Sequence, residues 1–440
     1  MRDRGEAEAV VHDLSTDGRG VVRVGGVVYF APGALPGDRV KLALDAHTRP
    51  PSASVVRLLE PSPHRMAHPC PHATACMGSV WGTLAYSAQL ECKRALTERT
   101  LRKQVSVPEV LPTSPSPHPW EYRNRASLHV WEQNGRLYAG FLTEPRARTG
   151  VPIRECRLCS PTVNRGIARL ASVLNRLKPD ECASVPRRIQ IHETEAGAGM
   201  LAVFAGDCDP SLAAFWERAL GSASPGGVRC ASGTRAGVAD TRRPIHASPE
   251  ARPMLTHWLT QRVEVHPAAF CQANSGAAAA VFERLRELGK ELKPKRIWDL
   301  YGGWGALGLA SATEDQPVTV FESSPHAESA ARSLVKQLGT GRPEFATGDL
   351  DKTFPRHAHG IEADDLVILD PPRSGAHERV LSLLGQSLIR HIAYLSCNPA
   401  RLARDMAILA SHGFGAVETR PCDFFPQTPR IEVLAILRRR

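Results

Sequence analysis

The glycine-rich segment Asp299-Leu300-Tyr301-Gly302-Gly303-Trp304-Gly305 follows an apolar run and precedes a predicted helix. Glycines at such a turn let the backbone approach a ligand closely. Glu322 ends the next apolar run about 20 residues further on, where a carboxylate can accept hydrogen bonds from both hydroxyls of a ribose. This spacing favours a cofactor that carries a nucleoside, and it leaves NAD and S-adenosylmethionine both open.

Two more motifs each follow an apolar run in the last part of the chain. In Asp370-Pro371-Pro372-Arg373 the prolines fix a rigid turn, which is either purely structural or part of a site. Ser396-Cys397-Asn398-Pro399 opens a predicted helix, whose dipole stabilises a thiolate and makes Cys397 a candidate nucleophile. A cysteine at a strand end is also commonly a buried structural residue, so these residues alone leave both interpretations open.

A second group of cysteines has spacings that are compatible with a metal site. Cys70-x5-Cys76 and Cys156-x2-Cys159 could together bind zinc or an iron–sulfur cluster, although only the second spacing is common in zinc sites. The chain has 11 cysteines, so at least one has no disulfide partner. In a reducing compartment we expect them in the core, at a metal or in catalysis.

Residues 266–440 are predicted to form the domain that positions the three motifs. Predicted helices alternate there with short apolar runs, which indicates an open, mostly parallel sheet with helices on both faces. Ligands in such α/β sheets bind at the carboxyl ends of the strands, where the motifs lie. The predicted helices are 275–292, 325–338, 376–389 and 400–412, and the predicted strands are 296–300, 318–321, 366–369 and 392–395.

The first 265 residues are predicted to form two further domains. Residues 1–61 contain several short apolar runs separated by tight turns, which predicts a small closed β-barrel that binds RNA or serves as a protein module. Residues 62–265 are predicted to form a mixed α+β domain. A helix predicted at 84–104 carries Lys and Arg residues, on a face that is either solvated or binds nucleic acid.

The overall charge is compatible with a polyanionic partner such as nucleic acid. The 440 residues include 55 Lys and Arg against 45 Asp and Glu, a net charge of +10. The N-terminus has no apolar segment long enough for a signal peptide, and no stretch approaches the roughly 18 apolar residues of a membrane helix. We therefore expect a cytoplasmic protein without a membrane partner.

Taken in order, the motifs resemble those of the TRAM-domain RNA uracil-5-methyltransferases over nearly the whole chain. Residues 7–60 resemble the TRAM barrel, and Phe270-Cys271-Gln272-Ala273-Asn274 resembles the family's cofactor segment. Arg404-Asp405 and then Asp423-Phe424-Phe425-Pro426-Gln427-Thr428 follow the three motifs above. The resemblance implies a class I methyltransferase (Rossmann-like) domain, a TRAM/OB-like barrel and S-adenosylmethionine-dependent methylation of uridine C5 in structured RNA.

The resemblance also implies a role for each site residue. Cys397 would add to C6 of uracil, which makes C5 nucleophilic, and Glu432 would then remove the C5 proton. Asp370 would lie within reach of both cofactor and base, and the base is expected to leave its stack. The residues expected to contact S-adenosylmethionine are Gln272, Tyr301, Gly303, Gly305, Ala306, Glu322, Asp349 and Asp370.

The sequence departs from the family pattern at the expected 4Fe-4S cluster. The family binds the cluster with a C-x5-C-x2-C segment and a distant fourth cysteine. Cys70 and Cys76 match the first two positions and Cys156 resembles the fourth, whereas Ser79 stands at the third. A remnant of three cysteines can lack a cluster, unless another cysteine substitutes for the missing ligand. The candidates for that substitution are Cys159 and Cys92.

The target RNA stays open at the level of sequence. The barrel favours 23S ribosomal RNA, since transfer-RNA members often lack it, and transfer RNA is the alternative. Cytosine-5 methylation is disfavoured because those enzymes typically have a cysteine in the motif at 370–373. A catalytically silent RNA-binding or assembly factor is disfavoured by Cys397, Glu432 and Gln272. Arg430 stands where the family usually has histidine. We expect a monomer.

Overall fold

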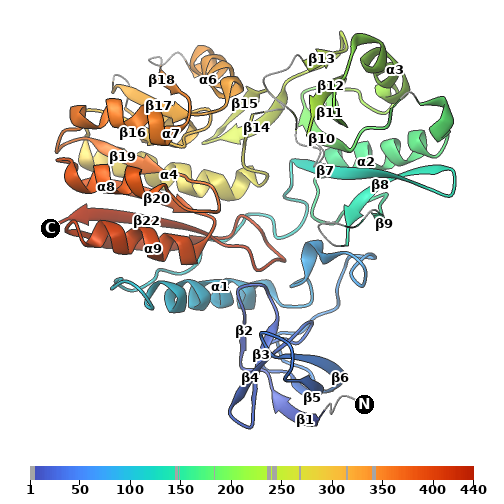
Figure 1. Ribbon diagram of the computed structural model, residues 1–440, viewed down its shortest axis with the longest axis horizontal. Coiled ribbons are helices and arrows are strands. Elements are labelled where there is room, and N and C mark those ends of the chain that lie inside the picture. Colours follow the sequence, from blue (N-terminus) through green and yellow to red (C-terminus); the bar gives the residue numbers. More distant parts are fainter. Residues whose placement is uncertain are drawn as a thin grey trace.

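The computed structural model describes residues 5–143, 147, 149–182, 184–234, 239, 245–266, 269–313, 316–338 and 343–440. In chain order they form a small all-β unit, a central sheet with two helices, and an α/β unit that contains the C-terminus (Figure 1). The predicted fold class is confirmed.

The N-terminal sheet has six strands: β1 (Glu6–Val10), β2 (Asp13–Leu14), β3 (Gly20–Val24), β4 (Val27–Ala31), β5 (Arg39–Asp45) and β6 (Ser52–Glu60). Their order is β1-β5-β6-β4-β3-β2. The two residues that connect the edge strands β1 and β2 continue the pairing. The N–H of Val11 donates to the Asp38 carbonyl (2.9 Å), and the N–H of His12 donates to the Val21 carbonyl (3.1 Å). The sheet therefore curls into a barrel around a small apolar core that includes Val22.

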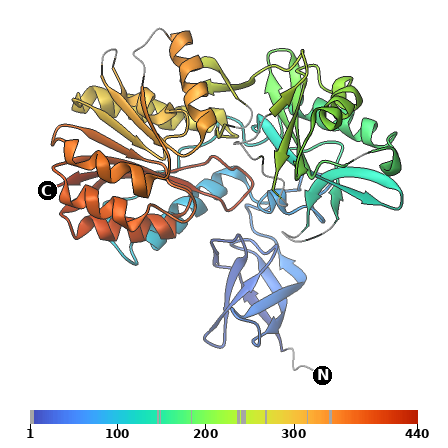
Figure 2. The same ribbon diagram turned by 45° about the horizontal axis from the view of Figure 1, so that its top comes forward.

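The barrel stands below the other two units in Figure 2, and buried side chains pack it onto the C-terminal unit. Leu14 and Leu35 leave the barrel core and join the large apolar cluster of the C-terminal unit, together with Trp81. At the barrel exit, Arg65 donates to both carboxylate oxygens of the buried Asp38 (3.0 and 2.5 Å). These contacts fix the barrel relative to the C-terminal domain.

The central unit is a seven-stranded sheet covered by two helices. The helices are α2 (Pro161–Leu174), which packs on strands β8, β10 and β11, and α3 (Pro210–Gly221), which packs on β12. The order of the strands is β13-β12-β11-β10-β7-β8-β9, and only β11 and β12 pair in parallel. Their bounds are β7 (Arg125–Gln133), β8 (Arg136–Leu142), β9 (Gly150–Pro152), β10 (Arg188–Thr194), β11 (Gly197–Ala205), β12 (Val228–Gly233) and β13 (Ile245–Ala247).

The C-terminal sheet has seven strands: β16 (Ile297–Leu300), β17 (Val318–Glu322), β18 (Glu344–Thr347), β19 (Leu366–Leu369), β20 (His391–Ser396), β21 (Phe414–Cys422) and β22 (Glu432–Arg439). Their order is β18-β17-β16-β19-β20-β22-β21. The first five are parallel, whereas β22 runs antiparallel to β20 and β21 antiparallel to β22. The four predicted strands are confirmed, and the antiparallel pair was not predicted.

Helices cover both faces of this sheet (Figure 1). Alternate residues of one strand enter two different cores: Val367 packs with α8 and α9, and Ile368 packs with α4 and α5. The predicted helices 275–292 and 325–338 have the predicted ends, while α8 and α9 are shorter than predicted. The helices are α4 (Ser275–Leu292), α5 (Ala306–Ser311), α6 (Pro325–Leu338), α7 (Leu350–Thr353), α8 (Glu378–Gln386) and α9 (Pro399–Ala410).

Two elements from the middle of the chain pack on the C-terminal sheet. Helix α1 (Tyr86–Leu101) contacts α9 and β21. The hairpin of β14 (Met254–Trp258) and β15 (Gln261–Val265) contacts α4 and α6. In the part of the chain described above, no helix is both long and apolar enough to cross a bilayer.

Candidate active site

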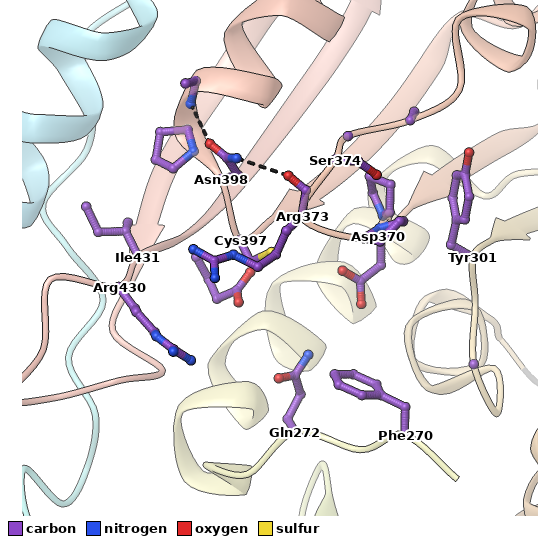
Figure 3. Close-up of a pocket in the computed structure, with 18 of the residues that line it drawn as sticks. Phe270, Gln272, Tyr301, Asp370, Arg373, Ser374, Cys397, Asn398, Arg430 and Ile431 are labelled. Atoms are coloured by element: carbon purple, nitrogen blue, oxygen red, sulfur yellow. Dashed lines mark hydrogen bonds between the residues drawn. The ribbon is translucent and has the colours of Figure 1, made fainter. Parts of the chain in front are cut away.

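The carboxyl ends of the parallel strands open into a cavity of about 1420 Å³ (Figure 3). Ligands bind at this edge of open α/β sheets. Of the ten residues predicted for catalysis and cofactor binding, two do not line this cavity: Ala306 lines a smaller adjoining cavity of about 50 Å³, and Gly305 is the N-cap of α5. The other eight line it: Gln272, Tyr301, Gly303, Glu322, Asp349, Asp370, Cys397 and Glu432.

Cys397 and Glu432 come together because β22 pairs antiparallel with β20. Ser396 lies opposite Val433 in this ladder. Cys397 follows Ser396 and Glu432 precedes Val433, so the two residues stand at the same end of neighbouring strands. Glu432 is buried, whereas Cys397 is partly exposed to the cavity. A nucleophile thus lies beside a carboxyl group that can move a proton.

The environment of the site raises the pKa values of its thiol and of two of its carboxyl groups. Burial raises the pKa of the Cys397 thiol to about 11, Glu432 and Asp370 add to the shift, and Arg373 opposes it. Burial and Asp370 raise the pKa of Glu432 well above its usual range, again opposed by Arg373. Burial, Asp299 and Glu322 raise the pKa of Asp370 to about 7. Once ionised, a carboxylate with a raised pKa is a stronger base.

Glu322 is fixed at the end of β17 by backbone donors. The N–H of Gly303 donates to its Oε2 (3.0 Å), and those of Ser323 and Ser324 donate to its Oε1 (2.7 and 2.8 Å). Gly303 has a φ of +55°, which glycine adopts without the steric cost that a side chain would add. The glycine turn and the acidic residue therefore form one unit that presents carboxylate oxygens to the cavity.

The segment around Gln272 is held by the central domain. Asn124 donates two hydrogen bonds to this segment, one from its N–H to the Ala273 carbonyl (3.0 Å) and one from its Nδ2 to the Gln272 carbonyl (3.3 Å). Arg125 donates to the Cys271 carbonyl (2.5 Å). The start of β7 thus positions one wall of the cavity, although it lies about 150 residues earlier in the chain.

The loop after β19 is held against the helix that follows Cys397. Asp405 Oδ2 accepts from the Ala376 N–H (2.8 Å) and from the Tyr394 hydroxyl (2.5 Å), and Arg404 donates to the Ala376 carbonyl (3.0 Å). Gly375 has a φ of +85°, and a Cβ there would lie 2.7 Å from the Arg404 side chain. The Arg404-Asp405 motif therefore positions the loop that carries Asp370 and Arg373.

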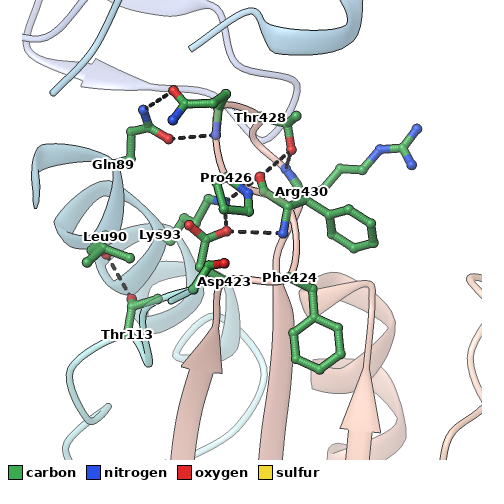
Figure 4. Close-up of polar contacts among 12 residues, drawn as sticks. Gln89, Leu90, Lys93, Thr113, Asp423, Phe424, Pro426, Thr428 and Arg430 are labelled. Carbon is green, nitrogen blue, oxygen red and sulfur yellow. Dashed lines mark hydrogen bonds and ion pairs between the residues drawn. The ribbon is translucent and has the colours of Figure 1, made fainter. Parts of the chain in front are cut away.

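The loop between β21 and β22, which leads into Glu432, is anchored by α1 (Figure 4). Lys93 and Asp423 form an ion pair (2.5 Å) in which both side chains are 0% exposed, and Lys93 also donates to the Phe425 carbonyl (3.0 Å). Gln89 and Gln427 exchange two hydrogen bonds (2.8 and 2.9 Å). Helix α1 therefore sets the path of the chain into Glu432.

Comparisons with known proteins agree with this geometry. Residues 275–406 match the family profile described as Conserved hypothetical protein 95. A 23S rRNA (uracil(1939)-C(5))-methyltransferase RlmD from Thiobacillus denitrificans is 30% identical, over 98% of this chain and 99% of the relative. The RlmD of Xanthomonas oryzae pv. oryzae is also 30% identical, over 100% and 98%.

The chain belongs to the RNA (uracil-C5)-methyltransferase family.

A solved structure shows the same fold over almost the full length. It is the Pyrococcus abyssi tRNA (uracil-54, C5)-methyltransferase in complex with S-adenosyl-L-homocysteine, with a TM-score of 0.71 and 23% identity. The match covers 98% of this chain and 100% of that one. The fold described above, from the N-terminal barrel to the C-terminal sheet, is therefore shared with that structure.

Besides Arg125, three arginines to which the sequence assigned no role line the same cavity. Arg373 belongs to the motif at 370–373, in which only the prolines and Asp370 were given a role. Arg123 lies in a segment without any local motif, so the sequence carried no signal for it. Arg430 was noted only as a departure from the family pattern. All three lie near Cys397 or the loop that leads to Glu432.

The cysteines of the expected cluster do not fit a 4Fe-4S site. Within the described ranges no group of three or more His, Cys, Asp or Glu side chains is arranged to hold a metal. Ser79 replaces one ligand and is buried, with its Oγ 3.3 Å from His68 Nε2. The His68 ring also contacts the Ser79 carbonyl (2.9 Å) and accepts from the Cys70 N–H (3.0 Å). Hydrogen bonds within the chain therefore hold the loop between residues 68 and 79.

Iron and acid-labile sulfide in anaerobically purified protein test this assignment. Because the ligand set is incomplete, we expect neither element in stoichiometric amount. Restoring the ligand with Ser79→Cys gives a matched variant for the same assay. Four iron and four sulfide per chain, typical of a 4Fe-4S centre, in the unsubstituted protein would contradict the assignment.

Lys93→Met tests the anchoring of the loop that leads to Glu432. Removing one partner of a buried ion pair leaves the other charge uncompensated, which costs about 3–5 kcal/mol. We expect a lower melting temperature and a loss of methyl transfer that exceeds the loss of cofactor binding. The double variant Lys93→Met/Asp423→Leu should recover part of the stability. Equal stability of the single variant and the unsubstituted protein would show that the pair anchors nothing.

Proposed function

We propose that this protein methylates C5 of a uridine in 23S ribosomal RNA, using S-adenosylmethionine and a covalent bond between Cys397 and C6 of the base. The observation that carries the proposal is the meeting of Cys397, Glu432 and Asp370 in one cavity, beside the Glu322 unit. A carboxylate fixed at a strand end suits the ribose of a nucleoside cofactor. Nucleophile, base and cofactor contacts thus share one edge of the sheet.

The chemistry follows from the weakness of uracil C5 as a nucleophile. As the Cys397 sulfur bonds to C6, the thiol proton passes to water, and the π electron pair of the C5–C6 bond moves onto C5 and O4. S-adenosylmethionine supplies the methyl group when bound, and C5 forms a bond to that carbon as the bond from the carbon to the cofactor sulfur breaks. Glu432, in its ionised form, then takes the C5 proton, the C5–C6 double bond forms again, and the bond from C6 to Cys397 breaks, so that the sulfur leaves as a thiolate.

Arg373 and Asp370 serve these steps from either side of the thiol. Arg373 favours the ionised forms of both Cys397 and Glu432, since its charge opposes the rise in their pKa values. Asp370, with a pKa of about 7, can hold a proton next to the base or the cofactor amine. Because the cavity is recessed, the target base has to leave its stack to reach Cys397.

Ribosomal RNA is the proposed substrate class because of the relatives and the barrel. The full-length relatives at 30% identity act, by their names, on 23S rRNA. The related archaeal structure acts on transfer RNA by its title, so transfer RNA is the alternative. We propose that the protein acts in the cytoplasm, where ribosomal RNA is available, as a monomer that needs no iron–sulfur cluster.

Mapping of 5-methyluridine tests the proposal. The modification would be mapped in ribosomal and transfer RNA from cells with and without the gene. Without the gene, 23S rRNA should lack 5-methyluridine at one position, and the intact gene should restore it. A gene with Cys397→Ala should not restore it, whereas Cys92→Ala, outside the cavity, serves as the control. Loss of a site only in transfer RNA would move the substrate class, and no lost site in either RNA would refute uracil methylation.

A further inference from the structure

The arginines at the mouth of the cavity have no acidic partners. Arg123, Arg373 and Arg430 all line the cavity, and within the described part of the chain none of them forms an ion pair. The Nε of Arg123 is buried without a hydrogen-bond partner. Clustered like charges repel one another, so the cluster is costly in the free protein and favours an anion.

Arg123 and Arg430 differ from Arg373 in their effect on the reacting groups. Arg373 influences both Cys397 and Glu432, so it belongs with the chemistry. The Arg430 guanidinium lies 5.8 Å from the centre of the Phe425 ring, which holds it in place. Arg373 and Arg430 enter the cavity from different loops and point toward the space beside Cys397 (Figure 3).

The barrel forms the other side of this mouth. Thr16 and Asp17, in the turn between β2 and β3, line the cavity, and a Cβ at Gly18 would lie 3.0 Å from the Pro429 ring. Asp17 is paired with Arg19 (2.7 Å), so it does not neutralise the cluster. A polymer that follows the barrel into the cavity therefore passes Arg430, which directly follows Pro429.

We propose that Arg123 and Arg430 form a phosphate-binding pair for the RNA backbone of the target nucleotide. This inference rests on the proposed function, and it names the residues that would contact the RNA backbone. Guanidinium groups bind phosphate oxygens in a bidentate geometry, and they stay charged at every physiological pH. With the phosphodiester held at the mouth, the sugar and base extend inward toward Cys397. The arginine at position 430 thereby supplies a permanent charge where the family usually has histidine.

The charges around Arg430 agree with an anion at this place. Arg430 is exposed, and partial desolvation together with the nearby charges of Arg373 and Arg123 lowers the pKa of its guanidinium. A bound phosphate would offset the charges of Arg373 and Arg123 and so raise the pKa of Arg430 again. Glu432 is buried, and burial together with the charge of Asp370 raises its pKa well above the usual range, which favours its neutral form beside the arginines.

Salt-dependent RNA binding by Arg430→Gln tests the proposal. Affinity for a fluorescent 20-nucleotide oligouridine and for a 23S rRNA transcript would be measured over a range of salt concentrations. One lost phosphate contact lowers the slope of log K against log salt by about 0.7 for a single strand. We expect that loss, a higher KM for the transcript, and an unchanged KM for S-adenosylmethionine and kcat. Arg430→Lys should restore most of the slope.

Arg332→Gln is the matched control, since Arg332 is exposed on α6, pairs with Glu328 and does not line the cavity. An unchanged slope in Arg430→Gln, with folding verified by its melting temperature, would overturn the proposal. So would a lower kcat with unchanged RNA affinity, or a raised KM for S-adenosylmethionine. If the unsubstituted protein neither binds nor methylates RNA, the proposed function itself fails.

Discussion

Strand β22 runs antiparallel to β20 at the side of an otherwise parallel run of strands, with Val433 opposite Ser396. This register decides whether the site exists. A slip of one residue would turn Glu432 to the other face of the sheet. A slip of two would move it by about 7 Å along the strand. The remaining contacts of the C-terminal domain can be understood as ways to hold that register and to fill the space around it.

Several distant parts of the chain secure the same edge. Lys93 fixes the turn that leads into β22, Asn124 fixes the segment around Gln272, and Asp405 fixes the loop after Asp370. The barrel joins through Leu14, which is buried in the core of the C-terminal domain. Each of these contacts is between residues far apart in sequence. The domains are therefore joined around the cavity by these contacts, and the barrel turn at Gly18 forms part of its mouth.

Sequence patterns predicted the parallel part of the sheet because its signals are local. Helix α4 begins at an Asn274 cap and carries a helical apolar face, and buried runs such as 366–369 end in a turn. The antiparallel pair escaped prediction since β22 is buried along most of its length and has no alternation of polar and apolar residues. Glu432 was found through a family motif and not through its local pattern.

What the sequence could not supply were the long-range partners. Nothing near Lys93 indicates that its partner is Asp423, 330 residues away. Arg123 likewise lies in a segment without a motif and gains its place only through the fold. Ser79 shows the converse case, because one residue type sufficed to place the iron–sulfur cluster in doubt, and the hydrogen bonds of His68 give the structural reason.

The central claim is that Cys397 and Glu432 perform successive steps on one base. It is tested by incubating Glu432→Gln with S-adenosylmethionine and a 23S rRNA transcript, and separating the products on a denaturing gel. Without the Glu432 carboxylate as general base, release of the RNA from Cys397 should slow by about 100-fold or more. The account predicts a covalent protein–RNA species that carries the transferred methyl group and is absent in Cys397→Ala/Glu432→Gln. Full turnover by Glu432→Gln, with no covalent species, would contradict it.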